Sequence, residues 1–151
     1  MKYILILLLL TACSKPQAEQ LEEVKDYNYT PKEIELSHLI NHLRDSIGLD
    51  TLTLNNHISF KSEEHNFYMI SKNIISHDNN YQRFENIIEV LNCTKVGEVL
   101  AYNYQTNQNV LIAWINSPAH DTILVADYKR IGISIRYDEF QRMYYTVIFS
   151  D

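Results

Sequence analysis

The chain has 151 residues, 46% of them hydrophobic and only 3 glycines and 3 prolines, which is typical of one globular domain and excludes a disordered chain. Its formal net charge is −6 at pH 7, and it has no dense cluster of lysine and arginine, which excludes a nucleic-acid-binding surface. The 11 tyrosines are unusual, since their rings can lie half in a core and half at the surface. We therefore predict a single domain that does not bind nucleic acid.

Residues 1–12 have the pattern of a signal peptide. Lys2 supplies a positive charge, and Tyr3 to Leu10 form an apolar stretch that is too short to cross a bilayer as a helix. The stretch ends in Leu-Thr-Ala-Cys, which resembles a bacterial lipobox and implies export, cleavage before Cys13 and a diacylglycerol on its sulfur. The alternative is an ordinary signal peptide that contains a cysteine. We expect a lipoprotein of the cell envelope, held on a bacterial membrane by acyl chains, such as palmitate, on Cys13.

Residues 13–31 are predicted to be the lipidated N-terminus and a tether, and residues 32–151 the folded domain. The stretch from Ser14 to about Tyr29 is polar and acidic and lacks a sustained apolar period, although a short surface helix within it is an alternative. Cys93 is then the one cysteine of the mature domain, so the sequence indicates no disulfide framework. We predict that its thiol is buried as a small apolar group.

The capping residues and the apolar period predict helices first and strands last. Thr30, Pro31 and Glu33 form a capping box with proline at the first helical position. The first three predicted elements are helices: one from Pro31 to Gly48, one capped by Asn55 or Asn56 and continuing to about Ile75, and one from Asn79-Asn80 to Leu91. A strand from Val96 to Tyr102 follows, then a helix capped by Thr106 and continuing through Trp114, and a short helix begun by Ser117-Pro118. Two strands end the chain: Ile131 to Tyr137, which is predicted to be half-buried, and Met143 to Ser150. This order predicts an α+β fold with helices packed on the faces of an antiparallel sheet.

Seven short motifs, none of them specific alone, occur in an order that closely resembles the CAP superfamily of cysteine-rich secretory, antigen 5 and pathogenesis-related proteins, also called the SCP domain. The motifs are Ser76-His77, Arg83, Gly97-Glu98, Val110 with Trp114, Ser117-Pro118-Ala119-His120, Ile131-Gly132-Ile133, and Tyr144 to Phe149. The resemblance is to the compact bacterial form and covers roughly Glu35 to Phe149. It implies an α-β-α sandwich, in which a small antiparallel sheet lies between helical layers.

The resemblance also implies a cleft with two histidines and two acids, which binds a divalent cation such as zinc in some members. His77 and His120 match the histidines, and Glu98 matches one acid. Ser117 stands where many relatives have the second acid, and Val99 follows Glu98 where the family has asparagine. We predict a ligand-binding cleft formed by His77, Glu98, Ser117 and His120, with no catalytic residue.

His77, Glu98 and His120 are the predicted metal ligands, because zinc and similar divalent cations favour imidazole nitrogen and carboxylate oxygen. His120 would lie at the third position of a helix that Ser117 begins, where the helix dipole favours the neutral imidazole that a metal needs. In the alternative interpretation, both histidines form hydrogen bonds to Glu98 and fix a helix end against a strand. The sequence leaves both interpretations open.

Other histidines are weaker candidates. His38 and His42 are spaced four residues apart on the first helix, but no glutamate follows His38, so they do not form a metalloprotease motif and are predicted to be solvated. His57 and His65 are predicted to lie at the surface or at the cleft rim. Trp114 is predicted to anchor its helix in the core.

We predict that the protein is a ligand-binding module for a lipid, a cation or a protein partner. The alternative is a metal-dependent hydrolase or peptidase, with zinc on His77 and His120 and with Glu98 as third ligand or general base. A serine hydrolase built on Ser117 is disfavoured, because a hydroxyl that caps a helix is already engaged and no nucleophile-elbow glycines surround it.

Overall fold

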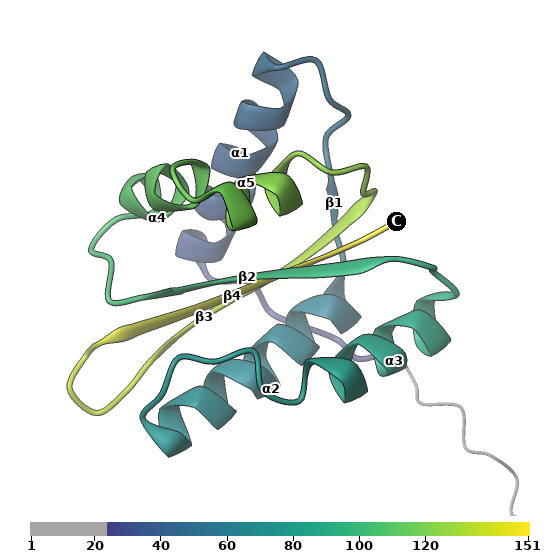
Figure 1. Cartoon of the computed structure of the whole chain (residues 1–151). Helices are drawn as coiled ribbons and strands as arrows, with labels where there is room; N and C mark the ends of the chain where they lie inside the picture. Colours follow the sequence, from purple (N-terminus) through teal and green to yellow (C-terminus); the bar gives the residue numbers. More distant parts are fainter. Residues whose placement is uncertain (1–23) are drawn as a thin grey trace, which may run out of the picture.

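A four-stranded sheet with helices on both faces forms the body of the protein (Figure 1). The computed structural model describes residues 24–151, so the predicted signal peptide, Cys13 and most of the predicted tether lie outside the described residues. The strand order is β1-β3-β4-β2. The strands are β1 (Thr53–Leu54), β2 (Val96–Tyr102), β3 (Arg130–Tyr137) and β4 (Met143–Ser150). β4 is antiparallel to β2 and to β3, whereas β1 runs parallel to β3.

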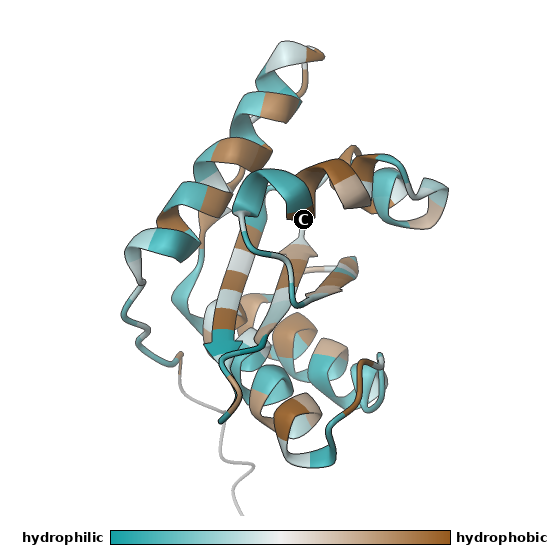
Figure 2. Ribbon diagram, turned by 90° about the vertical axis from the view of Figure 1, so that its left-hand side faces the viewer, coloured by the Kyte–Doolittle hydropathy of each residue, from teal (hydrophilic) through white to brown (hydrophobic). Residues whose placement is uncertain are grey.

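The helices form two layers, one on each face of the sheet. α1 (Pro31–Ser46), α4 (Asn107–Ile115) and α5 (Pro118–Leu124) cover one face, and α2 (Asn56–Lys72) and α3 (Asn80–Leu91) cover the other (Figure 1). Figure 2 shows hydrophobic and hydrophilic residues alternating along α1, as expected of a helix that buries one side. The predicted α+β class and α-β-α sandwich are confirmed. Among the described residues, no helix has the length and apolar character needed to cross a bilayer.

The predicted capping residues begin most of the helices. Thr30 accepts a hydrogen bond from the backbone of Glu33, whose side chain bonds back to Thr30, so the capping box is present. α2 ends at Lys72, earlier than the predicted Ile75, because Asn73 adopts a left-handed conformation that terminates the helix. Ser117 occupies the N-cap position of α5, but within the described part of the chain its hydroxyl makes no capping hydrogen bond.

β3 is buried on both faces, although its alternating sequence predicted a half-buried strand. The structure buries Gly132 and Ser134 as well as the alternating isoleucines, because α2 packs on the face that the alternation assigned to solvent. A Cβ atom at Gly132 would overlap the α2 backbone at Ile58 and Ser59. The missing side chain therefore lets α2 lie directly against the strand.

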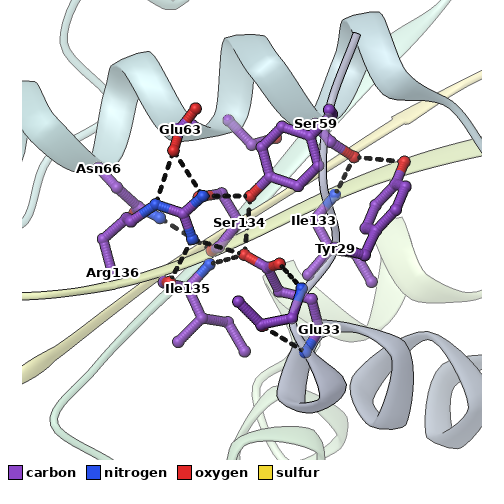
Figure 3. Close-up of polar contacts among 12 residues, drawn as sticks. Tyr29, Glu33, Ser59, Glu63, Asn66, Ile133, Ser134, Ile135 and Arg136 are labelled. Atoms are coloured by element: carbon purple, nitrogen blue, oxygen red, sulfur yellow. Dashed lines mark hydrogen bonds and ion pairs between the residues drawn. The ribbon is translucent and has the colours of Figure 1, made fainter.

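Side chains cover the edge of β3 beyond the short strand β1 (Figure 3). Among the described residues, β1 pairs only with the first two residues of β3. Further along, the backbone N–H of Ile133 donates to the hydroxyl of Ser59 at 3.0 Å, and that of Ile135 donates to the carboxylate of Glu33 at 2.8 Å. Arg136 donates back to the carbonyl of Ile135 at 2.7 Å. Side chains of α1, α2 and Arg136 thus bond the N–H groups of Ile133 and Ile135 and the carbonyl of Ile135.

The segment before α1 is fixed to the domain by two tyrosines. The hydroxyl of Tyr27 donates to Glu33 at 2.7 Å and accepts from Arg136 at 2.8 Å, and Glu33 is itself fully buried. The hydroxyls of Tyr29 and Ser59 lie 3.0 Å apart, and the two tyrosine rings meet edge to face. These contacts extend the folded body toward the N-terminus, past the predicted boundary between residues 31 and 32.

Candidate functional site

The candidate site is built around Glu98, which β2 places almost completely out of solvent, with 4% of the residue exposed. One carboxylate oxygen accepts a hydrogen bond from Nδ1 of His77 at 2.7 Å. Arg83 donates from two guanidinium nitrogens, with Nε 2.8 Å from Oε2 and Nη2 3.0 Å from Oε1. Both oxygens of Glu98 are therefore engaged by neighbouring side chains.

Two adjacent segments bring these partners to Glu98. Arg83 lies in the first turn of α3 on the side that faces the sheet, and its remaining nitrogen donates to the carbonyl of Asp78 at 3.2 Å. His77 comes from the loop between α2 and α3, and about half of its side chain is exposed. The arrangement joins the start of α3, the preceding loop and the sheet through one buried carboxylate.

The carboxyl group of Glu98 is ionised at neutral pH. Burial alone would raise its pKa, but the hydrogen bond from His77 and the charge of Arg83 outweigh this effect and hold the pKa below its usual value. An ionised carboxylate only accepts hydrogen bonds, so Nδ1 of His77 carries the proton that it donates. In neutral His77 the free lone pair is then on Nε2, the arrangement in which a carboxylate orients a ligand histidine.

His120 lies at the third position of α5 and is half-buried. Burial and the charge of His77 lower the pKa of His120, so its imidazole is neutral at pH 7. The sequence predicted a neutral His120 from the helix dipole, whereas the structure attributes it to burial and to His77.

The residues do not fit the predicted three-ligand metal set. Among the described residues, no group of three or more histidine, cysteine, aspartate or glutamate side chains is arranged to hold a metal ion. The guanidinium of Arg83 already pairs with the carboxylate of Glu98, with the shortest nitrogen–oxygen distance at 2.7 Å. The alternative interpretation, a histidine hydrogen-bonded to Glu98, is observed for His77. We therefore derive no reaction step through a metal.

Some sequence-based interpretations near the site differ from the structure. His57 and His65 were expected at the surface or at the cleft rim, and both are buried: Nε2 of His57 lies 2.9 Å from the side-chain oxygen of Asn86, and Nε2 of His65 lies 2.8 Å from the carbonyl of Ser76. His65 also lines a pocket beside Arg83, so the expected rim position is not contradicted for this residue. These hydrogen-bond partners lie on α3 and in the loop between α2 and α3. The hydroxyl of Ser117 is not engaged as a cap. That argument against a serine hydrolase therefore fails, and the missing nucleophile-elbow glycines remain as the argument.

Sequence reasoning missed the role of Arg83. The residue was recognised as part of a motif, but no partner was assigned to it. The available signal was its position four residues before Ile87 on the buried side of α3, where an unpaired arginine is rare. A buried arginine is usually paired, and here the partner is Glu98, a buried acid of the neighbouring strand.

A second concave surface lies between α1 and α4, on the opposite face of the sheet. It is a groove of about 400 Å³, lined mainly by leucine and isoleucine with a few polar side chains, namely Leu39, His42, Leu43, Ser46, Gln108, Leu111 and Ile115. Both His38 and His42 are exposed, as predicted, and His42 lies at this groove. Trp114 anchors α4 in the core, with its indole N–H 2.8 Å from the carbonyl of Leu100, as predicted.

The sheet lies between two helical layers and carries a buried glutamate bonded to a histidine and an arginine. Comparison with known proteins identifies the family. The chain belongs to the cysteine-rich secretory protein (CAP) family, whose model matches residues 38–149. No curated protein sequence matches the chain.

Solved bacterial structures share the fold. An outer surface protein of Borrelia burgdorferi superposes with a TM-score of 0.75 at 20% identity, covering 85% of this chain and 98% of that protein. A cysteine-rich secretory protein of Staphylococcus aureus and an extracellular SCP-domain protein of Bacillus anthracis each give a TM-score of 0.68 at 19% identity and cover 83% of this chain. The matched regions make up 42% and 45% of those two longer chains.

Proposed function

We propose that the protein is a non-catalytic ligand-binding module, exported and held at the cell envelope through lipid on Cys13. The observation that carries the proposal is the engagement of Glu98. Its carboxylate is almost fully buried, ionised and hydrogen-bonded on both oxygens by Arg83 and His77. A general base must come within hydrogen-bond reach of a substrate proton, and a carboxylate that is 4% exposed and already bonded on both oxygens is poorly placed for this role.

The same observation disfavours the metal-dependent hydrolase. That mechanism requires Glu98 as a third zinc ligand or as a base beside the metal, and both roles need the oxygens that Arg83 holds. Export is supported by the descriptions of the structural neighbours, which are outer surface or extracellular proteins. The lipobox-like sequence before Cys13 supports lipid attachment.

The groove between α1 and α4 is the proposed seat of a lipid acyl chain. Its lining is mainly apolar, while His42, Ser46 and Gln108 supply polar groups for the head of an amphipathic molecule. The groove volume, about 400 Å³, lies within the usual range for small-molecule sites, roughly 300–1,000 Å³. A protein segment with one apolar side chain is the alternative occupant.

The affinity of this proposed binding site is measured by titrating the full chain, in detergent-free vesicles, with a fluorescent fatty acid. Ile115→Gln places a polar group in the groove and should weaken binding by roughly tenfold, which corresponds to about 1.4 kcal/mol. Ile112→Gln is the matched control, because Ile112 is an exposed isoleucine of the same helix that does not line the groove. Equal affinity of the two variants would contradict the assignment.

Calorimetric zinc titration tests the predicted cation site. We compare the unmodified protein with His77→Ala and His120→Ala. Since Glu98 is held by Arg83, we expect no tight zinc binding and indistinguishable heats in all three proteins. If the unmodified protein bound zinc tightly and both variants lost that binding, a metal site at His77 and His120 would be established. The metal-dependent hydrolase would then again be a candidate function.

A further inference from the structure

A pocket of about 260 Å³ lies between α2 and α3, in the helical layer on the other face of the sheet from the α1–α4 groove (Figure 1). The side that α2 contributes consists of four residues spaced as one helical face, namely Lys61, Glu64, His65 and Tyr68. All four carry a polar or ionisable group. A helix face turned toward a neighbouring helix usually carries apolar residues, so this polar face needs an explanation.

α3 lines the same pocket with a second polar face of identical spacing. This face begins at the N-cap residue Asn79 and continues with Gln82, Arg83 and Asn86. The buried apolar residue of α3, Ile87, belongs instead to the core against the sheet. At the pocket, the two helices therefore face each other across polar side chains and not across an apolar seam.

The charges that line the pocket are balanced by partners. Nζ of Lys61 lies 3.1 Å from the carboxylate of Glu64, and the guanidinium of Arg83 is paired with Glu98. The pocket therefore has little net charge with which to attract an anion. Among the described residues, no group of three or more metal-ligating side chains is placed to hold a cation either. These observations favour a neutral ligand.

Uncharged amide groups stand at the rim of the pocket. The side chains of Asn79 and Gln82 are exposed there, and each amide has two N–H donors and a carbonyl acceptor. A hydroxyl group likewise donates one hydrogen bond and accepts others, whereas a simple anion only accepts. The amides therefore suit a ligand that carries several hydroxyl groups.

The ring of Tyr68 supplies an apolar face beside these amides. It stacks on the ring of His65 with centroids 5.9 Å apart and planes inclined by 12°, and its hydroxyl donates to Asp78 at 3.1 Å. The two contacts hold the ring in place before any ligand binds, which lowers the entropy cost of binding. An aromatic face next to polar groups can contact the C–H groups of a sugar ring while the amides bind its hydroxyls.

We propose that the α2–α3 pocket binds a single neutral sugar ring, with its hydroxyls on Asn79 and Gln82 and one face on Tyr68. The pocket volume, about 260 Å³, lies just below the range of roughly 300–1,000 Å³ that is usual for small-molecule sites, which fits one ring and not an extended ligand. The site is separate from the proposed acyl-chain groove and does not depend on lipid attachment at Cys13.

Saturation-transfer NMR with the full chain on phosphatidylcholine vesicles tests the site, with glucose, galactose and N-acetylglucosamine as probes and empty vesicles as the blank. We expect at least one of these sugars to bind in the millimolar range. Gln82→Ala should weaken that binding by about fivefold through the loss of one hydrogen bond. Asn80→Ala is the matched control and should leave binding unchanged, because Asn80 is an exposed amide of α3 that does not line the pocket.

The role of the aromatic face is tested at Tyr68. Tyr68→Phe keeps the ring and should retain most of the binding, whereas Tyr68→Leu removes the aromatic face and should weaken binding by about tenfold. Far-ultraviolet circular dichroism of each variant checks that the helices are intact. Equal affinity of the two variants would show that the ring of Tyr68 is not part of the site and would overturn the proposed binding mode.

The proposal is also overturned if none of the three sugars binds, or if Gln82→Ala and Asn80→Ala have equal effects. Binding of inorganic phosphate in place of the sugars would show an anion site and would overturn the neutral ligand. The proposed acyl-chain groove is unaffected by any of these results, since the fatty-acid titration with Ile115→Gln and Ile112→Gln measures it separately.

Discussion

The ion pair of Arg83 and Glu98 is the residue-level feature on which the site depends. Both side chains are shielded from water, and each supplies the other's counter-charge. The net value of such a pair is modest, because desolvation offsets much of the attraction, but the loss of one partner leaves an uncompensated buried charge. The pair is therefore a sensitive place to test the structure.

Arg83→Ala should lower the free energy of unfolding by about 3–5 kcal/mol, because Glu98 would remain buried without its main counter-charge. Urea unfolding followed by Trp114 fluorescence measures the change. Arg142→Ala is the control, since Arg142 pairs with Asp138 at the protein surface and should cost far less. Equal losses in the two variants would show that Glu98 does not depend on Arg83.

His65 should make stability depend on pH. Burial lowers its pKa, and the nearby charge of Glu98 offsets this only in part. In the unfolded chain a histidine titrates near about 6.5, so below that pH the unfolded chain binds a proton that folded His65 does not. The free energy of unfolding should therefore decrease as the pH falls from about 6.5 to the lower pKa of the folded state.

His65→Gln should reduce this dependence, because glutamine keeps an N–H donor for the carbonyl of Ser76 but does not titrate. Urea unfolding at pH 7, 6 and 5 gives the slope in each protein. Part of the slope should remain in the variant, since the pKa of His120 is lowered as well. A slope identical to that of the unmodified protein would rule out the contribution of His65.

The pairing of buried polar side chains is the part of the site that could not be predicted from the sequence. His77 and Glu98 were predicted to share a site, and the hydrogen bond between them was one of two interpretations left open. The pairing of Glu98 with Arg83 was not predicted, because the two residues lie on different elements and only the packing of α3 on β2 brings them together. The burial of His57 and His65 was missed for a related reason, since their partners Asn86 and Ser76 lie outside α2 and no sequence pattern distinguishes a buried polar side chain from a solvated one.

At the scale of elements, the contact of α2 with β3 depends on Gly132. A methyl group there would overlap backbone atoms of α2, which can yield only if the helix moves. Gly132→Ala should therefore destabilise the protein by about 1–3 kcal/mol, the usual cost of overpacking a core. Thermal unfolding followed by circular dichroism measures the shift of the midpoint.

Gly97→Ala is the matched control on β2. A methyl group at Gly97 would meet the hydroxyl end of Tyr128, a side chain that can move aside. The loss of stability should be clearly smaller than for Gly132→Ala. A larger loss at Gly97 would show that the tightest helix–sheet contact lies elsewhere.

Local chemistry explains which elements were predictable. The starts of helices could be predicted, because capping residues such as Thr30 and Asn55 form hydrogen bonds to residues close to them in the sequence. β2 was predicted at its observed bounds from a short apolar run. The two-residue strand β1 was missed, because its pairing with β3 is a tertiary contact and two residues show no period.

On the scale of the whole molecule, the central sheet couples the two helical layers. α2 packs against both β3 and β4, and α1 packs against β3 from the other face. We expect the domain to unfold in one cooperative step, since neither layer retains a buried face without the sheet. Trp114 fluorescence, which reports on α4, and far-ultraviolet circular dichroism, which reports on all helices, should give the same urea midpoint. Separate midpoints would contradict this.

The hydrogen bonds from Ser59, Glu33 and Arg136 to the backbone of β3 have a consequence for solubility. A strand with free N–H and carbonyl groups along its edge is a template on which another copy can add a strand, which is how many β-rich proteins aggregate. Here both N–H groups, of Ile133 and Ile135, and the carbonyl of Ile135 are already bonded to side chains of the same molecule. The buried charge of Glu33 adds a further barrier, since an incoming strand would have to displace a carboxylate that is bound to an arginine. This side of the sheet is thereby closed to chain-to-chain association without the need for a longer outer strand.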